Sequence, residues 1–279
     1  MSQRFEGHFR GSDQNDLFFQ TWTPEKVRGT FIITHGLAEH SECYHPLAHI
    51  LADDGWQVFG WDMRGHGRSE GKRGFVRDIK SFVEDYACFV RVVKKQSPDF
   101  TPVLFGHSLG GLVTIRHVEQ ENPQIAALAL SSPCLGLSMP VPKHKELLAK
   151  FAVNWMPQLT MFNEIKYTDL THDPEMLKSY AKDSLRHDKI SPGLFLTMVE
   201  NFPKAVEGAS EISLPVLMQL AGEDRLVSTA ASRALYDRLP GKKNQLIVYP
   251  ESFHEIFNDL DRDKAAADLK KFINPFLGV

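Results

Sequence analysis

Gly106-His107-Ser108-Leu109-Gly110 joins a short apolar run to a run with helical periodicity. Upstream, Val103-Leu104-Phe105 predicts a buried strand, and downstream the residues from Leu109 to Glu121 predict a helix. A serine on a sharp turn between strand and helix projects its hydroxyl above the sheet, so the flanking positions must be small. The strand, the glycine-flanked turn and the helix together predict that Ser108 is a nucleophile.

Two further residues complete the chemistry that Ser108 requires. A serine hydroxyl needs a general base, and the base needs an orienting carboxylate. In this kind of fold both follow the serine along the chain, each on a loop after a strand. The predicted strand 215–220 runs into an acidic loop, which makes Asp224 the candidate acid and Glu223 the alternative. The predicted strand 245–249 leads to His254, the candidate base among the 12 His of the chain.

An oxyanion hole of backbone N–H groups is also needed to stabilise a tetrahedral intermediate. One donor belongs to the residue after the nucleophile, here Leu109. The second is expected on a loop after an early strand, and the predicted strand 31–34 runs into His35-Gly36-Leu37. We therefore expect the Leu37 N–H to be the second donor, on a loop whose conformation depends on Gly36.

Strand-like and helix-like segments alternate along most of the chain, which predicts the α/β class. An opening hairpin (6–10 and 17–22) is followed by strands near 30–34, 57–61, 103–105 and 125–131, with helices between them. We expect an α/β-hydrolase-type core: a mostly parallel, eight-stranded sheet flanked by helices, with ligands at the carboxyl ends of its strands. All the candidate residues lie at such ends.

This alternation is interrupted from about residue 135 to 208, where helical runs (143–154, 174–182 and 192–201) appear without a convincing strand. We expect residues 1–134 and 209–279 to form the core, and 135–208 to form a helical cap over the strand ends. About half of its apolar residues should pack inside the cap. The rest, dense in 153–162, predict an apolar tunnel or a surface that touches membranes transiently.

Composition limits the partners and cofactors that we expect. A hydrophobic content of 42% and a charged content of 24% are ordinary for a globular protein, and a net charge of −3 gives no reason to expect nucleic-acid binding. The 3 Cys are widely spaced, the N-terminus has no signal-peptide core, and no apolar stretch is long enough to span a bilayer. We expect a cytoplasmic enzyme with no metal, because neither H-E-x-x-H nor a Cys pair with ligand spacing occurs, and with no cofactor.

On these residues the chain resembles the monoglyceride lipase and lysophospholipase branch of the α/β-hydrolases, a group of serine aminopeptidase-like hydrolases, over nearly its whole length. The matching segments are His35 to His40 with Tyr44, Asp62 to Gly71, Gly106 to Gly111, Ser131 to Pro133, Gly222 to Val227, and Tyr249 to Glu255. The resemblance implies the same triad and oxyanion donors. It also implies a cap that admits one long acyl chain, and hydrolysis of monoesters of glycerol or of its phosphorylated derivatives.

Two departures from the resemblance concern the substrate headgroup. In mammalian monoglyceride lipases a glutamate, an arginine and a second histidine hold the glycerol end. Glu39 matches the glutamate, but Cys43 stands at the arginine position and Phe257 at that of the second histidine. The resemblance therefore implies weaker recognition of free glycerol, and a broader esterase or lysophospholipase activity is open.

Two other readings keep the fold but change the function. A peptidase that removes N-terminal residues would need an acidic cluster to hold the substrate amine, and the predicted cap contains acidic residues: Glu164, Asp169, Asp173, Glu175, Asp183 and Glu200. A ligand-binding protein on a hydrolase fold is the second alternative, because fold does not guarantee function. Dehalogenases and epoxide hydrolases use an aspartate nucleophile, whereas this turn carries Ser108.

Overall fold

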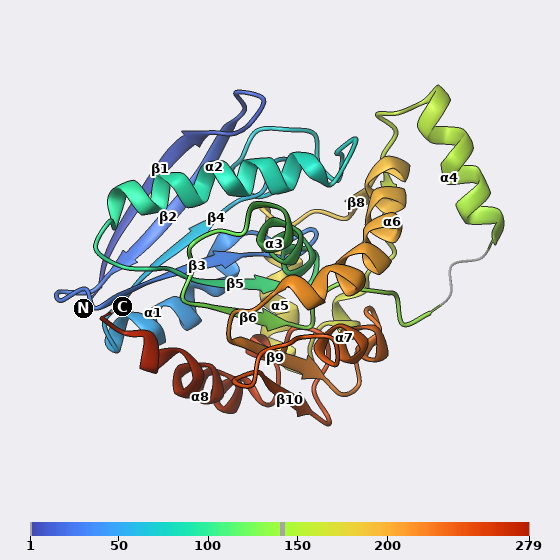
Figure 1. Ribbon diagram of the computed structural model, residues 1–279. Coiled ribbons are helices and arrows are strands. Elements are labelled where there is room, and N and C mark those ends of the chain that lie inside the picture. Colours follow the sequence, from blue (N-terminus) through green and yellow to red (C-terminus); the bar gives the residue numbers. More distant parts are fainter. Residues whose placement is uncertain (1, 140–142, 279) are drawn as a thin grey trace.

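The computed structural model describes residues 2–139 and 143–278, and a sheet of eight strands runs through its centre (Figure 1). The strands lie in the order β1-β2-β4-β3-β5-β6-β9-β10. β2 runs antiparallel to both of its neighbours, whereas the pairings from β4 to β10 are parallel. The mostly parallel sheet predicted from the sequence is confirmed. The strands are β1 (Gln3–Arg10), β2 (Asp16–Thr23), β3 (Gly29–Thr34), β4 (Trp56–Trp61), β5 (Val103–His107), β6 (Ala127–Ser131), β9 (Val216–Ala221) and β10 (Gln245–Tyr249).

Helices cover both faces of the sheet, so the sheet has an apolar core on each side. One face packs against α1 (His45–Asp53) and α8 (Arg262–Ile273), the other against α2 (Lys80–Gln96), α3 (Ser108–Glu121), α6 (Pro192–Gly208) and α7 (Thr229–Tyr236). Central strands covered on both faces must be apolar along their whole length, and β3, β5, β6 and β9 are buried throughout. Short 3-10 helices lie at Ser41–Tyr44, Tyr167–Asp169, Ala209–Glu211, Ile256–Asn258 and Asn274–Phe276.

The chain between β6 and β9 forms an insertion that contains α4 (Lys143–Trp155), β7 (Met161–Phe162), α5 (Pro174–Lys182), β8 (Lys189–Ile190) and α6. Two of its helices begin where the sequence provides a cap followed by proline. The Asp173 carboxylate accepts the N–H of Glu175 at 2.8 Å, and the Ser191 hydroxyl accepts the N–H of Leu194 at 3.1 Å. The expectation of an all-helical insertion is wrong in one respect, because β7 and β8 pair antiparallel. Strands of two residues are too short to show an alternating pattern in the sequence.

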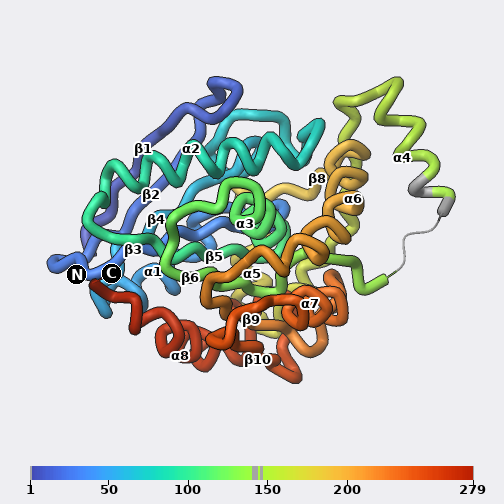
Figure 2. The backbone as a smooth tube through the Cα atoms, in the orientation of Figure 1, coloured from blue at the N-terminus to red at the C-terminus, as the bar shows by residue number. Residues whose placement is uncertain are grey.

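The apolar residues of the insertion divide between its interior and its surface. Leu194 and Met198 on α6 are buried, whereas the larger side chains of α4 point outward and Trp155 is 74% exposed. Figures 1 and 2 show α4 at the margin of the molecule, packed on α6. The dense apolar run therefore lies at the surface and does not wall an enclosed tunnel. No helix among the described residues is both long and apolar enough to cross a membrane. The exposed apolar residues of α4 and its neighbourhood are Leu147, Leu148, Phe151, Trp155, Met156, Leu159, Met161 and Phe162.

Candidate active site

Ser108 begins α3 directly after β5, at the carboxyl edge of the sheet. Its φ of +50° lies in the left-handed region, which non-glycine residues rarely occupy, so the turn is strained. The turn also needs small neighbours: a Cβ on Gly110 would lie 2.2 Å from the carbonyl oxygen of His35, and a Cβ on Gly36 would lie 3.1 Å from the Ser108 Cβ. These close approaches show that Ser108 and the first turn of α3 pack directly against the loop after β3.

His254 and Asp224 meet at the same edge, on the loops after β10 and β9. The His254 Nδ1 lies 2.7 Å from the Asp224 Oδ2, and both side chains are buried. The other Asp224 oxygen accepts the N–H groups of Leu226 and Val227, each at 2.9 Å. Because Asp224 accepts at Nδ1, the His254 Nε2 keeps the free electron pair of a base. Glu223, the alternative acid, is exposed.

The charges of this pair reinforce each other. Burial alone would lower the pKa of His254, but the charge of Asp224 and its hydrogen bond outweigh burial and hold that pKa above its ordinary value. Burial would likewise raise the pKa of Asp224, yet His254 and the two backbone N–H groups hold it below its ordinary value. The His107 ring lies 4.8 Å from the His254 ring, and burial lowers its pKa to about 3, so His107 is neutral at neutral pH. The arrangement suits a histidine that takes a proton from a hydroxyl.

The loop after β3 (residues 35–40) carries the Leu37 N–H that the sequence predicts as an oxyanion donor. It is called the oxyanion loop below, after that prediction. Its residue Ala38 has a φ of +68°, so this loop also contains a strained backbone position. His35 braces the loop, because its Nε2 accepts the N–H of Met63 at 2.9 Å. Glu39 turns back into the loop, where its Oε1 accepts the N–H of Gly36 and, at 2.7 Å, the hydroxyl of Tyr44. The loop is therefore tied at both ends before any substrate binds.

Three residues that the sequence did not suggest lie next to this site: Arg186, Glu255 and Tyr180. The Arg186 Nη1 lies 3.2 Å from the Glu255 Oε1, and its Nη2 lies 3.8 Å from the Glu39 Oε2. The Tyr180 hydroxyl donates to Glu255, and the Tyr180 ring centre lies 3.8 Å below the Arg186 guanidinium. Arg186 also contacts the Cys43 Sγ at 3.5 Å, so the insertion brings a guanidinium to the position where the resemblance implied one on the core.

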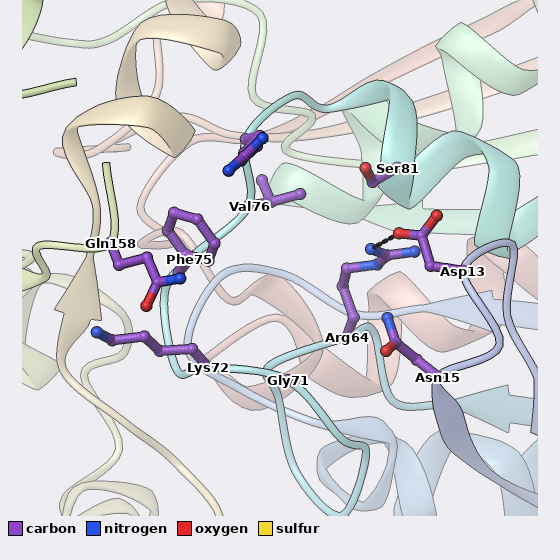
Figure 3. A pocket seen from close by; sticks show the side chains of 10 residues that line it. Asp13, Asn15, Arg64, Gly71, Lys72, Phe75, Val76, Ser81 and Gln158 are labelled. Carbon is purple, nitrogen blue, oxygen red and sulfur yellow. Dashed lines mark hydrogen bonds and ion pairs between the residues drawn. The ribbon is translucent and has the colours of Figure 1, made fainter. Parts of the chain in front are cut away.

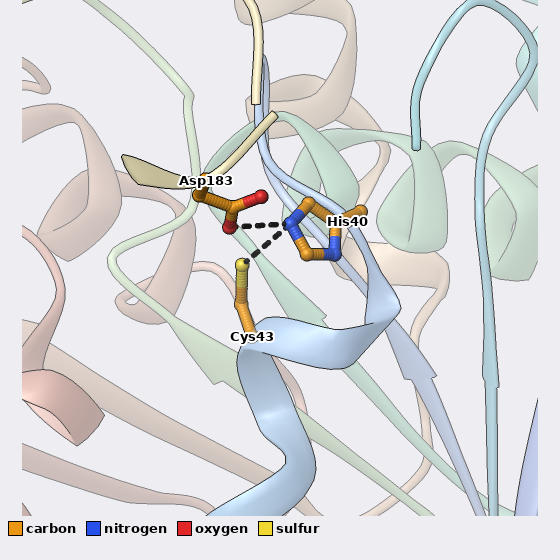
Figure 4. A group of neighbouring side chains, drawn as sticks. All are labelled: His40, Cys43 and Asp183. Atoms are coloured by element: carbon orange, nitrogen blue, oxygen red, sulfur yellow. Dashed lines mark hydrogen bonds and ion pairs between the residues drawn. The ribbon is translucent and has the colours of Figure 1, made fainter. Parts of the chain in front are cut away.

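His40, Cys43 and Asp183 form a small cluster of potential metal ligands, with ligand atoms within 4.8 Å of one another (Figure 4). The His40 Nε2 already lies 2.8 Å from the Asp183 Oδ2 and 3.6 Å from the Cys43 Sγ. Burial raises the pKa of the Cys43 thiol far above its ordinary value, which keeps it protonated, and a guanidinium lies beside it. A protonated thiol next to a cation is a poor metal ligand, so the cluster is a hydrogen-bonded joint between core and insertion.

A cavity of about 320 Å³ opens beside the loop after β4 and is lined by Arg64, Lys72, Phe75 and Gln158 among others (Figure 3). It contains none of Ser108, Asp224 and His254. Its buried cation is already paired, because Arg64 lies 2.6 Å from Asp13 and 2.6 Å from Asp85. The cavity therefore has no place in the chemistry of Ser108.

Comparison with known proteins agrees with this geometry. The family model described as "Serine aminopeptidase, S33" matches residues 25–261. A monoacylglycerol lipase of Mycolicibacterium smegmatis is 30% identical over 274 residues, covering 98% of each chain, and the phospholipase YtpA of Bacillus subtilis is 26% identical over 92% of this chain and 99% of its own. The crystal structure of the Paleococcus ferrophilus monoacylglycerol lipase matches with a TM-score of 0.82 at 29% identity, covering 98% of this chain and 99% of that one. The chain belongs to this serine aminopeptidase family of hydrolases and, within the α/β-hydrolase superfamily, to its monoglyceride lipase branch.

Proposed function

We propose that Ser108, Asp224 and His254 are the catalytic triad of a hydrolase that cleaves single-chain lipid esters through an acyl-enzyme. The His254 Nε2 accepts the Ser108 proton as the hydroxyl oxygen attacks the ester carbonyl. It then returns that proton to the leaving alcohol. In the second half His254 takes a proton from water as the water oxygen attacks the acyl-serine, and it gives that proton to the Ser108 oxygen as the fatty acid is released. Asp224 keeps the histidine in the reactive tautomer and stabilises its charged form.

One observation carries this proposal: the buried hydrogen bond of 2.7 Å between His254 and Asp224, at the same sheet edge as the strained turn of Ser108. The negative oxygen of the tetrahedral intermediate would lie against the N–H groups of Leu37 and Leu109. The approach of Gly36 to Ser108 supports this placement, because it brings the oxyanion loop against the nucleophile.

The substrate class follows from the relatives and from the polar end of the site. The similar proteins include monoacylglycerol lipases and a phospholipase. We therefore propose a monoacylglycerol or a lysophospholipid as substrate. We assign Glu39 to the headgroup, because its Oε2 is buried with no hydrogen-bond partner among the described residues. A substrate hydroxyl would supply that partner.

We assign residues 135–208 to a cap, and the outward face of α4 to transient contact with a membrane surface. Apolar side chains this exposed are costly in water and are typical of a surface that meets another apolar phase. Lipid esters reside in such a phase. We place the enzyme in the cytoplasm, a reducing compartment, since Cys43, Cys88 and Cys134 are all unpaired.

The acidic residues of the insertion do not favour the peptidase alternative. Five of them each pair with a different basic residue: Asp169 with Arg225, Asp173 with Arg262, Glu175 with Lys178, Asp183 with His40, and Glu200 with Lys204. Carboxylates that each already face a basic side chain do not provide a free acidic cluster for a substrate amine.

Hydrolysis of p-nitrophenyl esters from two to sixteen carbons, by the wild type and by Ser108→Ala, tests the proposal. We expect a preference for medium or long chains in the wild type and a loss on the order of 10⁶-fold in the variant. Monoacylglycerol and lysophosphatidylcholine of the preferred length then separate the two headgroups. Activity that survives Ser108→Ala would overturn the triad, and release of amino acids from aminoacyl naphthylamides without esterase activity would favour the peptidase.

A further inference from the structure

The insertion contacts both loops on which the proposed chemistry depends. On the His254 side, the N–H of Glu255 donates to the carbonyl of Leu170 at 2.9 Å, and the Thr171 hydroxyl donates to the carbonyl of Asn258 at 2.7 Å. On the side of the oxyanion loop, the N–H of His187 donates to the carbonyl of Ala38 at 3.2 Å. The two loops belong to the core, yet much of what fixes them comes from the insertion.

A single side chain, Arg186, reaches both loops. Its two terminal nitrogens face the two oxygens of Glu255 at 3.2 and 3.3 Å, a bidentate arrangement, and one of them lies 3.8 Å from Glu39. The side chains of all three residues are almost completely buried, at 3%, 5% and 3% exposure. Glu255 directly follows His254, and Glu39 lies two residues after Leu37. The Arg186 guanidinium therefore links the loop of the proposed base to the loop of the proposed oxyanion donor Leu37.

The charges at this junction show why one guanidinium has a large effect. Two buried carboxylates in proximity repel each other, and burial, with the charge of Glu255 adding to it, raises the pKa of Glu39 to about 7. Burial alone would raise the pKa of Glu255 as well, but Arg186 outweighs it and holds that pKa below its ordinary value. Without the cation, the two carboxylates would be buried with no positive partner in this cluster, and their loops would be expected to move apart or take up protons.

We infer that Arg186 is a positioning residue for the hydrolase: from the cap, it sets the distance between the His254 loop and the oxyanion loop by holding Glu255 and Glu39 together. This inference rests on the proposed function, because it gives Arg186 no role unless His254 and the Leu37 N–H act on the same ester. A change in the distance between the two loops should destabilise the transition state more than the bound substrate. The reason is that the oxyanion and the transferred proton exist only during the reaction. The cap therefore contributes to turnover as well as to substrate entry.

The test compares Arg186→Lys and Arg186→Met with Arg262→Met on the preferred p-nitrophenyl ester. Lysine keeps the charge but loses the bidentate arrangement, and methionine loses both. We expect kcat to fall roughly 100-fold in Arg186→Met, less in Arg186→Lys, with KM changed by less than about threefold. Arg262 is the matched control, because it also links core to insertion, through Asp173 at 2.5 Å, but its side chain is half exposed and pairs with neither Glu255 nor Glu39. Its variant should keep wild-type kinetics.

A rescue experiment separates positioning from loss of the fold. Arg186→Ala leaves room for a free guanidinium ion, which we expect to restore part of kcat at concentrations far below those that unfold proteins. The double variant Arg186→Met/Glu255→Gln removes one of the two unpaired carboxylates and with it their mutual repulsion. We expect it to fold even where Arg186→Met does not, while keeping the low kcat. Wild-type kcat in folded Arg186→Lys and in the double variant would overturn the inference. If Ser108→Ala also retains activity, the proposed function itself fails; if Ser108→Ala is inactive, only the role of Arg186 is lost.

Discussion

Both oxygens of the Asp224 carboxylate accept hydrogen bonds, and this arrangement determines the tautomer and the pKa of His254. One oxygen is held by two backbone N–H groups at 2.9 Å, so the other can point only at the His254 Nδ1. An ionised acid in this position raises the pKa of the histidine and also selects its tautomer. A histidine with a raised pKa is a better base, but it is protonated over a wider range of acidic pH.

We therefore expect the acid limb of the pH dependence of kcat/KM to have its midpoint above the ordinary histidine value of about 6.5. Activity should be lost as pH falls through the pKa of His254, because the protonated ring cannot accept the Ser108 proton. In Asp224→Asn the charge is gone and burial dominates, so the midpoint should move to lower pH while kcat falls roughly 10⁴-fold. A pH–rate profile of both proteins provides the measurement. An unshifted midpoint in the variant would show that Asp224 does not control His254.

The residues that could be predicted from the sequence differ in kind from those that could not. Ser108, Asp224 and His254 each follow an apolar strand and lie in a local motif, so neighbouring residues in the chain indicate their place. Arg186 has no such signal, because its meaning depends on Glu255, which is 69 residues further along the chain. A buried ion pair between distant segments is created by the fold and leaves no spacing to recognise in one sequence.

At the scale of elements, α4 has its larger apolar side chains on the outside. Ala149 is buried and Val153 is half-buried next to Gly193 of α6, whereas Phe151 and Trp155 are exposed and stack on each other with ring centres 6.1 Å apart. The helical periodicity of this segment predicted a helix but did not reveal which of its two apolar faces meets the protein. That choice depends on α6, a long-range partner.

Tryptophan emission provides a direct test of membrane contact. Of the 4 Trp, three are completely buried and Trp155 is 74% exposed, so a blue shift on adding phospholipid vesicles reports on Trp155. We expect that shift in the wild type. We also expect Phe151→Ser to weaken vesicle binding roughly tenfold, because it removes one large apolar side chain from the contact. Phe5→Ser is the matched control, since Phe5 is 57% exposed on β1. Equal binding by all three proteins in a sedimentation assay would exclude α4 as the contact.

The central strands and most of the helices that the sequence predicted by range lie close to their predicted segments, because caps and apolar runs define them locally. α6 is longer, since it ends at Gly208 and not at 201, and no ranges were predicted for α7 and α8. α5 coincides with the predicted helix 174–182, and the Asp173-Pro174 pair accounts for its start. β7 and β8 could not be predicted, since each has two residues and exists only because the other is beside it. Elements that depend on local chemistry are readable from the sequence, and elements that depend on a distant partner are not.

At the scale of the whole molecule, histidines are buried in the neutral state in several places. Burial lowers the pKa of His35 to about 4, that of His107 to about 3 and that of His117 to about 4. Unfolded histidines titrate near 6.5, so between pH 6.5 and about 4 the unfolded chain binds more protons than the folded one. The free energy of unfolding must therefore decrease as pH falls through this window, by about 1.4 kcal/mol per pH unit for each such histidine.

His117 allows this to be measured at one position. Neither of its ring nitrogens has a hydrogen-bond partner among the described residues, and its ring packs edge-on against Tyr86 at 5.0 Å. His117→Phe should therefore keep the packing and reduce the slope of unfolding free energy against pH by roughly 1.4 kcal/mol per pH unit between pH 6.5 and 4. Urea denaturation at several pH values measures the slope. His117→Leu should give the same slope at a different absolute stability; a slope equal to that of the wild type in both variants would contradict the assignment.

The contacts that the insertion makes with the two core loops also restrict how this enzyme can be redesigned. Insertions of this kind are natural targets for exchange between relatives when a new substrate range is wanted, and here α4 and the residues that contact the two core loops are different parts of the insertion. Grafting a foreign segment in place of α4 alone leaves the contacts made by Leu170, Thr171, Arg186 and His187 untouched. A graft of the whole of 135–208 removes all of them at once. The replacement segment would then have to supply its own contacts to the loops that carry His254 and Leu37, on which the proposed chemistry depends.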